Sequence, residues 1–401
     1  MVNLMKNQLC FSLQISEIRN GIFIPKYYNP GITIYLHALE ATHELVCISD
    51  LIDNGNLVVA TGDEIGKMAY GTGEIPFVRT SDISNWEIKN DPKQGVGQYI
   101  YEQYATKQDV RAGDIFFVRD GTYLIGQSCF VTNNDLPCLY QSHILKFRIK
   151  DGSPISSLLF FACLNAPIVK KQIRAKQFTA DIIDTIGNRY RELILPVPKN
   201  YGLVSKIVNG LDKINCERIQ LREIIRKIPF MAQGIIHELS EDLPLELLRA
   251  TEHKGNAGFK VPFSKIRSGV FIPKYYDPQL EENLSELSKT HSLVKLSELV
   301  NAEILSWETG IEIGKMAYGT GSIPFIRTSD ISNWELKRDP KQNVSEEIYE
   351  TYKQDIQPED IFIVRDGTYL VGTSCILTEH DTNILYCGGI YKLRIEQKDL
   401  E

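Results

Sequence analysis

Hydrophobic and polar positions follow two different periods along the 401-residue chain. Short runs rich in β-branched and aromatic residues, at 75–80 and 114–132, predict strands. The second run contains Asp120-Gly121, a pair that favours a tight turn between two strands. Segments 45–53 and 293–301 each predict a strand that enters a helix or turn, with Ser49 or Ser297 as the N-cap. These segments therefore predict mixed α and β structure.

The strand patterns occur twice. The segment IPFVRTSDISNWEI at 75–88 returns as IPFIRTSDISNWEL at 323–336, and GKMAYGTG begins at both Gly66 and Gly314. After a two-residue shortening, DIFFVRDGTYLIG from Asp114 matches DIFIVRDGTYLVG from Asp360. The repeated unit is roughly 140 residues long, which is a domain size and far longer than the repeats of a solenoid. The chain therefore contains tandem domains.

The region between the copies, 151–258, is not duplicated and has a helical period. Segment 156–178 predicts two short helices separated by Asn165-Ala166-Pro167. Farther on, apolar residues at alternating steps of three and four form a heptad seam with one polar member: Val204, Ile207, Leu211, Ile214, Arg218, Leu221, Ile225 and Ile228. A helix of about 25 residues would span about 38 Å. The seam favours a second helix against it, and the alternative is an ordinary amphipathic helix packed on a globular domain.

We therefore predict an α+β fold of two similar mixed α/β domains, 1–150 and 259–401. The central region, 151–258, separates them and contains a long coiled-coil-type spacer helix at about 203–228.

Composition narrows the class of protein. The chain is 43% hydrophobic and 24% charged, and it has neither a membrane-length apolar run nor a signal-peptide pattern, so a cytoplasmic protein is expected. Its eight cysteines lack metal-ligand spacing and are expected to be reduced thiols. The net charge of −7 argues against non-specific coating of nucleic acid. One basic segment fits either a local DNA patch or a solvated helix face: Lys170, Lys171, Arg174, Lys176, Arg189 and Arg191.

Several motifs resemble those of a known family. Each copy has the pattern Gly, Pro, apolar, Arg, two residues, Asp-Ile, here Gly73, Pro76, Arg79, Asp82, Ile83 and Gly321, Pro324, Arg327, Asp330, Ile331. Gly113-Asp114-Ile115 follows in the first copy, whereas the second has Glu359 at the Gly position. RYRELILPVP from Arg189 precedes the long helix. Each copy thus resembles a target recognition domain of the specificity (S) subunits of type I restriction-modification enzymes.

The resemblance implies a DNA-reading subunit without catalytic residues, metal or cofactor of its own. Such subunits act in phage defence in the cytoplasm of bacteria or archaea. Members recognise a bipartite site on double-stranded DNA, one half per domain. They seat methyltransferase subunits that modify adenine with S-adenosylmethionine, and a translocating restriction subunit joins them. The predicted spacer is also close to one turn of B-DNA, about 34–36 Å.

Family members usually carry a second spacer helix after the second domain, and nothing equivalent to 151–258 follows here. The chain is therefore expected to be a truncation. Its helical seam is expected to pair with the same helix of another chain, giving a homodimer, or with a methylation subunit.

Candidate DNA contacts are basic, amide and aromatic residues of the copies. They are Lys26, Tyr27, Lys67, Arg79, Asn85, Arg119, Tyr123, Gln141 and His143 in the first, and Lys274, Tyr275, Lys315, Arg327, Asn333, Arg365 and Tyr369 in the second. Arg79 could instead form an ion pair with Asp82 that fixes a turn. Trp86 and Trp334 fit packing better than base stacking. Because 141–143 reads Gln-Ser-His and 387–389 reads Cys-Gly-Gly, the half-sites should be related but not identical.

Two other classes of function remain open. One is a duplicated protein-interaction module without DNA specificity. The other is a metal-dependent nuclease built on Asp82, Glu87 and Lys89, although five positions between the acids is a short spacing for a two-strand metal site. A methyltransferase is disfavoured because Asp91-Pro92-Lys93 lacks the second proline and the aromatic residue of its catalytic tetrad.

Overall fold

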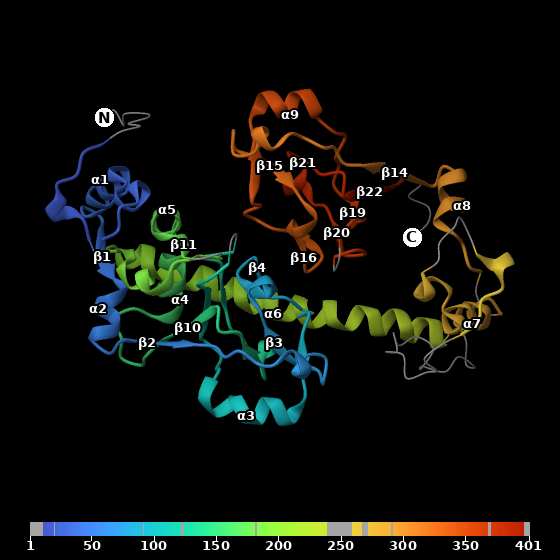
Figure 1. Ribbon diagram of the computed structural model, residues 1–401, viewed down its shortest axis with the longest axis horizontal. Helices are drawn as coiled ribbons and strands as arrows, with labels where there is room; N and C mark the ends of the chain where they lie inside the picture. Colours follow the sequence, from blue (N-terminus) through green and yellow to red (C-terminus); the bar gives the residue numbers. More distant parts are fainter. Residues whose placement is uncertain are drawn as a thin grey trace.

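The described strands of the first repeat between residues 57 and 149 form two sheets and a short hairpin in the computed structural model of the protein (Figure 1). The structure describes residues 11–19, 21–90, 92–121, 124–180, 183–238, 259–266, 272–289, 292–367 and 370–396. The larger sheet is antiparallel, in the order β2 (Leu57–Thr61), β10 (Ile144–Ile149), β7 (Ile115–Val118), β8 (Ser128–Phe130). The smaller sheet has the order β6 (Gly95–Val96), β3 (Ile75–Val78), β9 (Leu139–Tyr140), and the hairpin joins β4 (Ile83–Ser84) to β5 (Glu87–Ile88).

Described residues 305–395 of the second repeat contain strands that match these, in the same sheet order. Its larger sheet is β14 (Leu305–Thr309), β22 (Ile390–Ile395), β19 (Ile361–Val364), β20 (Ser374–Ile376). Its smaller sheet is β18 (Gln342–Val344), β15 (Ile323–Ile326), β21 (Leu385–Tyr386), and its hairpin is β16 (Ile331–Ser332) with β17 (Glu335–Leu336). The predicted strands in 45–53, 75–80 and 114–132 and the α+β class are confirmed, whereas the strand predicted at the start of 293–301 is wrong, because 293–295 is not in a strand and α8 follows directly. The Asp120-Gly121 turn is not tight, since β7 ends at Val118 and β8 starts only at Ser128.

Among the described residues, each repeat has three α-helices at matching positions. They are α1 (Pro30–Leu39), α2 (Ile48–Asp53) and α3 (Gln98–Gln108) in the first, and α7 (Pro278–Leu287), α8 (Leu296–Asn301) and α9 (Glu346–Tyr352) in the second. The predicted N-caps are wrong. Helix α2 begins before Ser49, with Cys47 at the N-cap, and α8 likewise begins before Ser297, with Lys295 at the N-cap.

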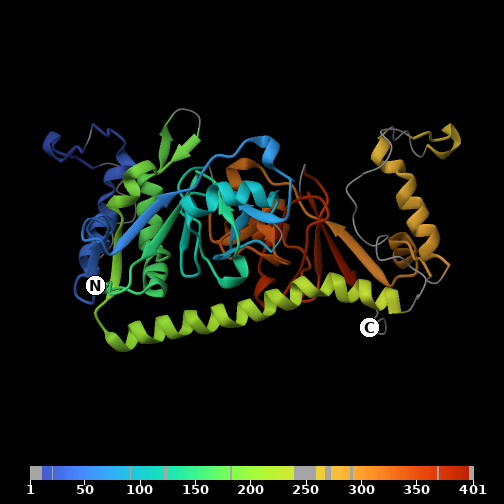
Figure 2. The same cartoon turned by 90° about the horizontal axis from the view of Figure 1, so that it is seen from below.

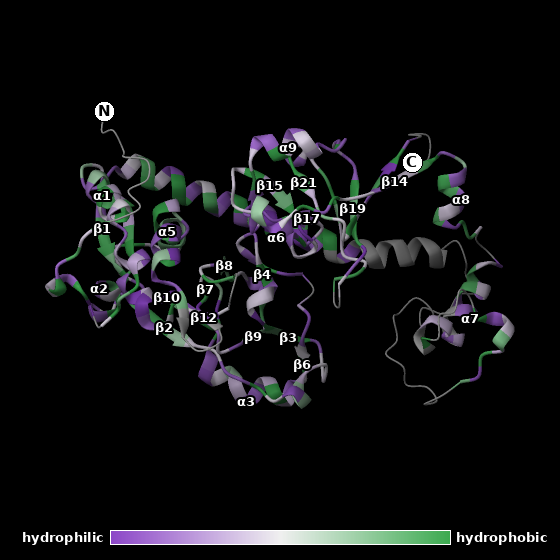
Figure 3. Ribbon diagram, turned by 45° about the horizontal axis from the view of Figure 1, so that its top comes forward, coloured by the Kyte–Doolittle hydropathy of each residue, from purple (hydrophilic) through white to green (hydrophobic). Residues whose placement is uncertain are grey.

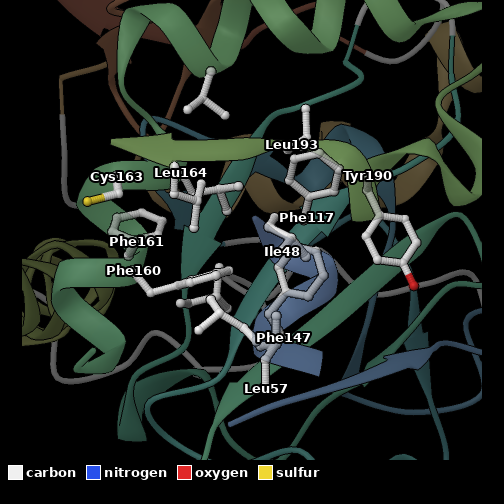
Figure 4. Packing of buried hydrophobic residues seen from close by; sticks show 14 of the residues in the cluster. Ile48, Leu57, Phe117, Phe147, Phe160, Phe161, Cys163, Leu164, Tyr190 and Leu193 are labelled. Atoms are coloured by element: carbon white, nitrogen blue, oxygen red, sulfur yellow. The ribbon is translucent and has the colours of Figure 1, made fainter. Parts of the chain in front are cut away.

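The core of the first repeat is completed by the central region. Two short helices, α4 (Ser157–Leu164) and α5 (Pro167–Lys176), flank Asn165-Ala166 as predicted, and the hairpin β11 (Phe178–Ala180) with β12 (Ile183–Thr185) follows. The 3-10 helix η6 (Gly187–Glu192) leads to β13 (Ile194–Pro198), which pairs antiparallel with β1 (His43–Cys47). Figure 4 shows Phe160 and Tyr190 beside Phe147 of the sheet. Each such ring contributes about 1.5–3 kcal/mol by burial. One hydrophobic core therefore contains residues from both sides of residue 150, where the sequence predicted the end of the first domain.

The long helix α6 (Tyr201–Glu238) follows β13 and contains 38 residues, so it spans about 57 Å. It runs along the first repeat and continues beyond it towards α7 and α8 (Figure 2). Val204 packs against the core, whereas Ile214 and Leu221 are exposed. Figure 3 shows the mixture of hydrophobic and hydrophilic positions along α6. The side chain of Ile228 lies outside the described residues.

The helix does not hold the repeats apart. The hairpin β4–β5 contacts the hairpin β16–β17 directly, through hydrogen bonds of Asn85 and Asn333. A rod that alone separates two readers is therefore not the observed arrangement. Among the described helices, none is long and apolar enough to cross a membrane. The described cysteines form no disulfide.

Candidate nucleic-acid interface

Polar side chains gather at one edge of the larger sheet in the first repeat. Strands β2 and β7 end and β10 begins at this edge, which brings together residues that are distant in sequence. Asp120 lies at the centre: Arg119 Nε donates to its Oδ2 at 2.8 Å, and His143 Nδ1 lies 3.1 Å from the same oxygen. His143 Nε2 is 3.9 Å from Glu64 Oε1. The sheet edge thus holds His143 between two carboxylates.

The charge of Asp120 is stabilised by these neighbours. Burial opposes ionisation of its carboxyl, but hydrogen bonds from Arg119, Thr185 and His143 hold the pKa of Asp120 below its ordinary value. Arg119 also donates from Nη2 to the Ser142 carbonyl at 3.2 Å. Arg119 is therefore committed to protein contacts, so a role as a free phosphate clamp is weakened.

The same edge of the second repeat has fewer polar side chains, because Gly388 and Gly389 replace Ser142 and His143. Arg365 donates to Asp366 at 3.0 Å and lies over the Tyr391 ring at 5.3 Å, but Gly389 stands where the first repeat has His143. Gly388, at the Ser142 position, lies beside the carboxylate of Glu312. The sequence difference at 141–143 and 387–389 is thus a difference in side chains at equivalent sheet edges.

A second matched feature is an exposed cationic loop. The 3-10 helices η3 (Lys67–Ala69) and η10 (Lys315–Ala317) have the same sequence in the two repeats. Lys67 and Lys315 are exposed, and the following Met68 and Met316 are 91% and 92% exposed. Lysines on exposed loops can neutralise phosphates at low desolvation cost. Both therefore remain candidates for DNA contact.

The loop in the first repeat forms one wall of a pocket of about 620 Å³. The other wall is the start of α3, where Gln98 and the exposed Tyr99 line the opening. At the matching start of α9 the second repeat has Glu346 and Glu347. The two repeats therefore have the same loop sequence, but the helix that follows it begins with neutral residues in α3 and with two acidic residues in α9. Strand and motif patterns do not single out this pair, although aligning 98–99 with 346–347 reveals the change of charge.

Tyr27 and Asn85, which the sequence suggested as DNA contacts, are both buried against other residues of the protein. Tyr27 is buried, donates a hydrogen bond to Glu192 and has Lys176 Nζ 4.4 Å from its ring centroid. Burial and the Glu192 carboxylate raise the pKa of Tyr27. Asn85 is also buried and donates to Glu335 Oε1 at 2.7 Å. These contacts account for both side chains without DNA, so the structure does not favour them as base readers.

The hairpin containing Asn85 makes reciprocal contacts with its twin. Asn85 Oδ1 accepts from the Arg338 N–H, and Asn333 Oδ1 accepts from the Asn90 N–H, both at 3.0 Å. Asn333 Nδ2 donates to Glu87 Oε1 at 3.0 Å, matching the bond from Asn85 to Glu335. Since corresponding residues exchange the same bonds, the hairpins are related by a local pseudo-two-fold axis.

The local sequence explains the shape of these hairpins. Asn85 and Trp86 have φ of 49° and 70°, and the equivalent Asn333 and Trp334 have 52° and 64°. Two positive φ values in a two-residue loop are typical of a type I′ turn, and asparagine tolerates this conformation best among non-glycine residues. Trp86 packs edge-on to Phe161 at 5.5 Å, as the packing interpretation predicted.

Arg79 follows strand β3, and Arg327 follows the equivalent strand β15. The ion pair expected between Arg79 and Asp82 is not formed. Asp82 is buried and accepts from the Arg79 backbone N–H at 2.9 Å, so the turn is fixed by main chain rather than by the guanidinium. Asp330 does the same for Arg327 at 3.0 Å. No ion pair involves Arg79 or Arg327 within the described part of the chain. Both guanidinium groups therefore remain available as DNA candidates.

Most of the basic segment stabilises the protein internally. Lys170 Nζ donates to the Gly126 carbonyl at 2.6 Å, and burial lowers the pKa of Lys170 to about 8. Lys176 binds Glu192 at 2.7 Å, and Arg191 binds Asp53 at 2.8 Å. Arg189 stacks 3.7 Å from the Phe178 ring centroid. Neither a DNA patch nor a solvated face describes Lys170, Lys176 and Arg189, whereas Arg191 forms an ion pair at the surface.

Arginines of α6 join this helix to the first repeat. Arg222 is buried and donates to Asp135 Oδ1 at 2.9 Å, to Asn90 Oδ1 at 2.6 Å and to the Ile88 carbonyl at 2.8 Å. Arg218, the polar member of the heptad seam, donates to the Asn85 carbonyl at 2.7 Å. Both arginines therefore tie α6 to the β4–β5 hairpin and its surroundings.

The remaining candidates are placed as follows. Lys26 and Tyr275 are exposed and Gln141 is half-buried. Tyr123, Tyr369 and the Lys274 side chain lie outside the described residues. The half-buried seam residues of α6 are Val204, Ile207, Leu211, Arg218 and Ile225.

A nuclease centre is not favoured by the carboxylates proposed for it. Asp82 is occupied by its turn, and Glu87 accepts a hydrogen bond from Asn333. Burial raises the pKa of both carboxyl groups, the opposite of what metal ligation requires. Within the described ranges, no group of three or more His, Cys, Asp or Glu residues could hold a metal ion.

Neither a protein-family model nor a curated protein matches the chain. Among solved structures, it is similar to the S subunit of a type I restriction-modification system from M. genitalium, with 14% identity, 88% of this chain and 73% of that chain covered, and a TM-score of 0.35. It is similar to the HsdS subunit from Thermoanaerobacter tengcongensis, with 15% identity, 89% and 76% coverage, and a TM-score of 0.31. A third chain, from a study of assembly and conformational transition of the type I R-M system, has 15% identity, 90% and 77% coverage, and a TM-score of 0.30.

Proposed function

We propose that the protein is a sequence-specific DNA-binding subunit of a type I restriction-modification system. It reads a bipartite site, one half per repeat, and has no catalytic residues of its own. The observation that carries this proposal is the pair of identical exposed loops, with Lys67 and Lys315, on two repeats whose hairpins exchange reciprocal contacts. Two readers related by a two-fold axis fit two half-sites in opposite orientation on a duplex.

The half-sites are related but not identical. The shared loops contact phosphates, which fixes register without reading sequence. Discrimination comes from the positions where the repeats differ, namely His143 against Gly389 and Tyr99 against Glu347. The net charge of −7 fits a protein that binds DNA through such local groups only.

Docking of the methylation subunits takes place on α6. Ile214 and Leu221 are seven positions apart on this helix and are exposed, as the knobs of an unpaired coiled-coil seam would be. The docked subunits supply S-adenosylmethionine and the adenine methylation, and a restriction subunit joins them in the cytoplasm of a bacterial or archaeal cell. The same stripe could alternatively form a homodimer.

The proposal is tested by binding of the full chain to random and genomic duplexes, with and without the cognate methylation subunit, across a salt series. We expect affinity to fall steeply with salt and to discriminate one sequence. Lys67→Gln and Lys315→Gln should each reduce the slope of log K against log salt by about 1. Lys150→Gln, just beyond the opposite end of β10, is the matched control. Absence of duplex binding in the presence of the methylation subunit would favour a protein-interaction module instead.

A further inference from the structure

The most exposed large hydrophobic residues in the described part of the chain are the methionines of the two cationic loops. Met68 in η3 and Met316 in η10 are 91% and 92% exposed. Both follow a lysine in the same sequence, Gly-Lys-Met-Ala-Tyr-Gly-Thr-Gly. A single exposed hydrophobic residue is common on protein surfaces. This one occurs in both repeats with the same neighbours and the same exposure, which calls for a shared role.

The loop of the first repeat is held in a fixed shape. The Ala69 N–H donates to the Gly66 carbonyl at 2.9 Å across the 3-10 turn. Thr72 Oγ1 donates to the Ala69 carbonyl at 2.7 Å and accepts from the Gly97 N–H at 2.9 Å. Gly73 approaches the same segment so closely that a Cβ there would lie 2.7 Å from the Gly97 Cα atom. The loop is thus joined firmly to the residues that precede α3.

The loop of the second repeat is held by the same bonds. The Ala317 N–H donates to the Gly314 carbonyl at 2.9 Å. Thr320 Oγ1 donates to the Ala317 carbonyl at 2.7 Å and accepts from the Ser345 N–H at 2.9 Å. A Cβ at Gly321 would lie 2.6 Å from the Ser345 Cα atom. Both methionines are therefore presented to solvent by loops whose shape is already fixed.

We infer that Met68 and Met316 are wedge residues that insert between adjacent base pairs of the bound duplex, one in each half-site, and partly unstack them. Apolar wedges of this kind, methionine among them, enter the DNA of many complexes from the minor groove. The preceding lysines hold the phosphates beside each insertion. The inference rests on the proposed function and specifies how the cationic loops contact DNA.

The chemistry of methionine suits insertion into a base stack. Its side chain is flexible and its sulfur is polarizable, so it fills irregular gaps and contacts aromatic faces favourably. Insertion also moves an apolar side chain out of water. Because the loops are already ordered by their own hydrogen bonds, little further ordering is required on binding. These contributions offset the cost of unstacking one base step.

The surroundings that the two methionines share favour DNA over a protein partner. Tyr99 lines the same pocket as Met68, but the second repeat has Glu347 at this position, so the apolar neighbour is not shared. What both loops share is the adjacent lysine. Within the described residues, neither Lys67 nor Lys315 forms an ion pair. A free cation beside a lone apolar side chain fits a phosphate beside a base stack.

The base step that receives each methionine should be a deformable one. Pyrimidine–purine steps such as TA and CA unstack most readily. Because the two loops have the same sequence, each half-site should contain such a step at the equivalent position. This step is the element that the half-sites have in common, whereas the residues that differ between the repeats read the bases that differ.

The test uses the full chain with its methylation subunit and the duplex that the binding experiment selects, with 2-aminopurine replacing one base at a time. The fluorescence of 2-aminopurine rises when stacking is lost, so it should rise at one step in each half-site. Met68→Gln should remove the rise in one half-site and Met316→Gln the rise in the other, because glutamine is of similar length but polar. Met68→Leu and Met316→Leu should retain both. A base that the methylation subunit extrudes would stay bright in every variant.

Affinity gives an independent measurement. Each glutamine variant should bind the duplex about tenfold more weakly, as expected when one apolar side chain no longer leaves water. The slope of log K against log salt should stay unchanged, since no charge is altered, whereas Lys67→Gln changes that slope. Ile34→Gln, at an exposed hydrophobic residue of α1, is the matched control and should change neither the affinity nor the fluorescence.

Three results would overturn the inference and leave the proposed function standing. They are salt-dependent duplex binding without a rise at any step, a rise that persists in both glutamine variants, and loss of co-purification with the methylation subunit in Met68→Gln/Met316→Gln. The last would place the methionines in a protein contact. Absence of duplex binding by the wild-type complex is the separate result that overturns the proposed function, and this inference with it.

Discussion

Asn85 and Asn333 occupy the same position in the two repeats, and each accepts a hydrogen bond from the backbone of the other repeat. The donors are the N–H groups of Arg338 and Asn90, and both distances are 3.0 Å. A contact in which corresponding residues exchange places is the arrangement found in two-fold dimers. Here it lies within one chain and fixes the orientation of one repeat against the other.

Removal of either amide should loosen this contact. Asn85→Gly and Asn333→Gly keep a backbone that tolerates φ of 49° and 52°, so they isolate the side-chain bonds. Each should lower the free energy of unfolding by about 1–3 kcal/mol, and the double variant should deviate from additivity because the residues share one interface. Urea unfolding measures this. Glu303→Gly, at φ of 56° on the surface, is the control. An effect on DNA discrimination with unchanged stability would instead restore Asn85 as a base reader.

The buried Arg222 should be the more critical anchor. Arg222→Met leaves Asp135 buried without its guanidinium partner, and breaking such a pair typically costs about 3–5 kcal/mol. Arg222→Met/Asp135→Asn should recover part of this loss, since the uncompensated charge is gone. Thermal unfolding of the single and double variants checks the prediction. Equal instability of both would show that the bonds to Asn90 and Ile88 matter more than the charge of Asp135.

Lys170 should give the protein a distinctive alkaline pH dependence. Burial lowers its pKa from 10.5 to about 8, so folding disfavours its charged form. Below pH 8 the ammonium group is charged in both states and the burial cost is complete, whereas above the unfolded pKa the cost disappears. Relative to Lys170→Met, the wild type should therefore gain about 3 kcal/mol as pH rises from 8 to 10.5. Urea unfolding of both proteins at several pH values measures the difference, and a constant difference would contradict the prediction.

The sequence predicted the local elements better than their partners. The duplicated strands and the pair of helices around Asn165 follow from residue type and period, which are local properties. The burial of Asn85 depends on Glu335 and Arg338, and the burial of Tyr27 depends on Glu192, all far away in the chain. No pattern around either residue indicates that partner. For the same reason a seam along α6 was predictable, but not which of its members would face the first repeat.

The exposed stripe on α6 should bind the methylation subunit. Ile214→Asp and Leu221→Asp replace exposed apolar side chains, so they should leave the free energy of unfolding within about 0.5 kcal/mol. They should nevertheless abolish co-purification with the cognate methylation subunit. Val204 packs on the core, so Val204→Asp should instead destabilise the fold. Light scattering of the isolated chain reveals whether the stripe forms a homodimer. Unchanged co-purification by both aspartate variants would exclude this face as the docking surface.

Exchange of charges beside the cationic loop should change DNA affinity in opposite directions in the two repeats. Gln98→Glu/Tyr99→Glu gives α3 the residues of α9, and adds two negative charges near Lys67. Acidic residues in the first turn favour a helix, so stability should not fall. Affinity for duplex DNA should decrease by about tenfold, because phosphate binding is electrostatic and each charge opposes it. The reverse change, Glu346→Gln/Glu347→Tyr, should increase affinity. Fluorescence anisotropy at fixed salt measures both. If neither pair alters affinity while Lys67→Gln does, the α3 rim lies outside the DNA contact and only the loop belongs to it.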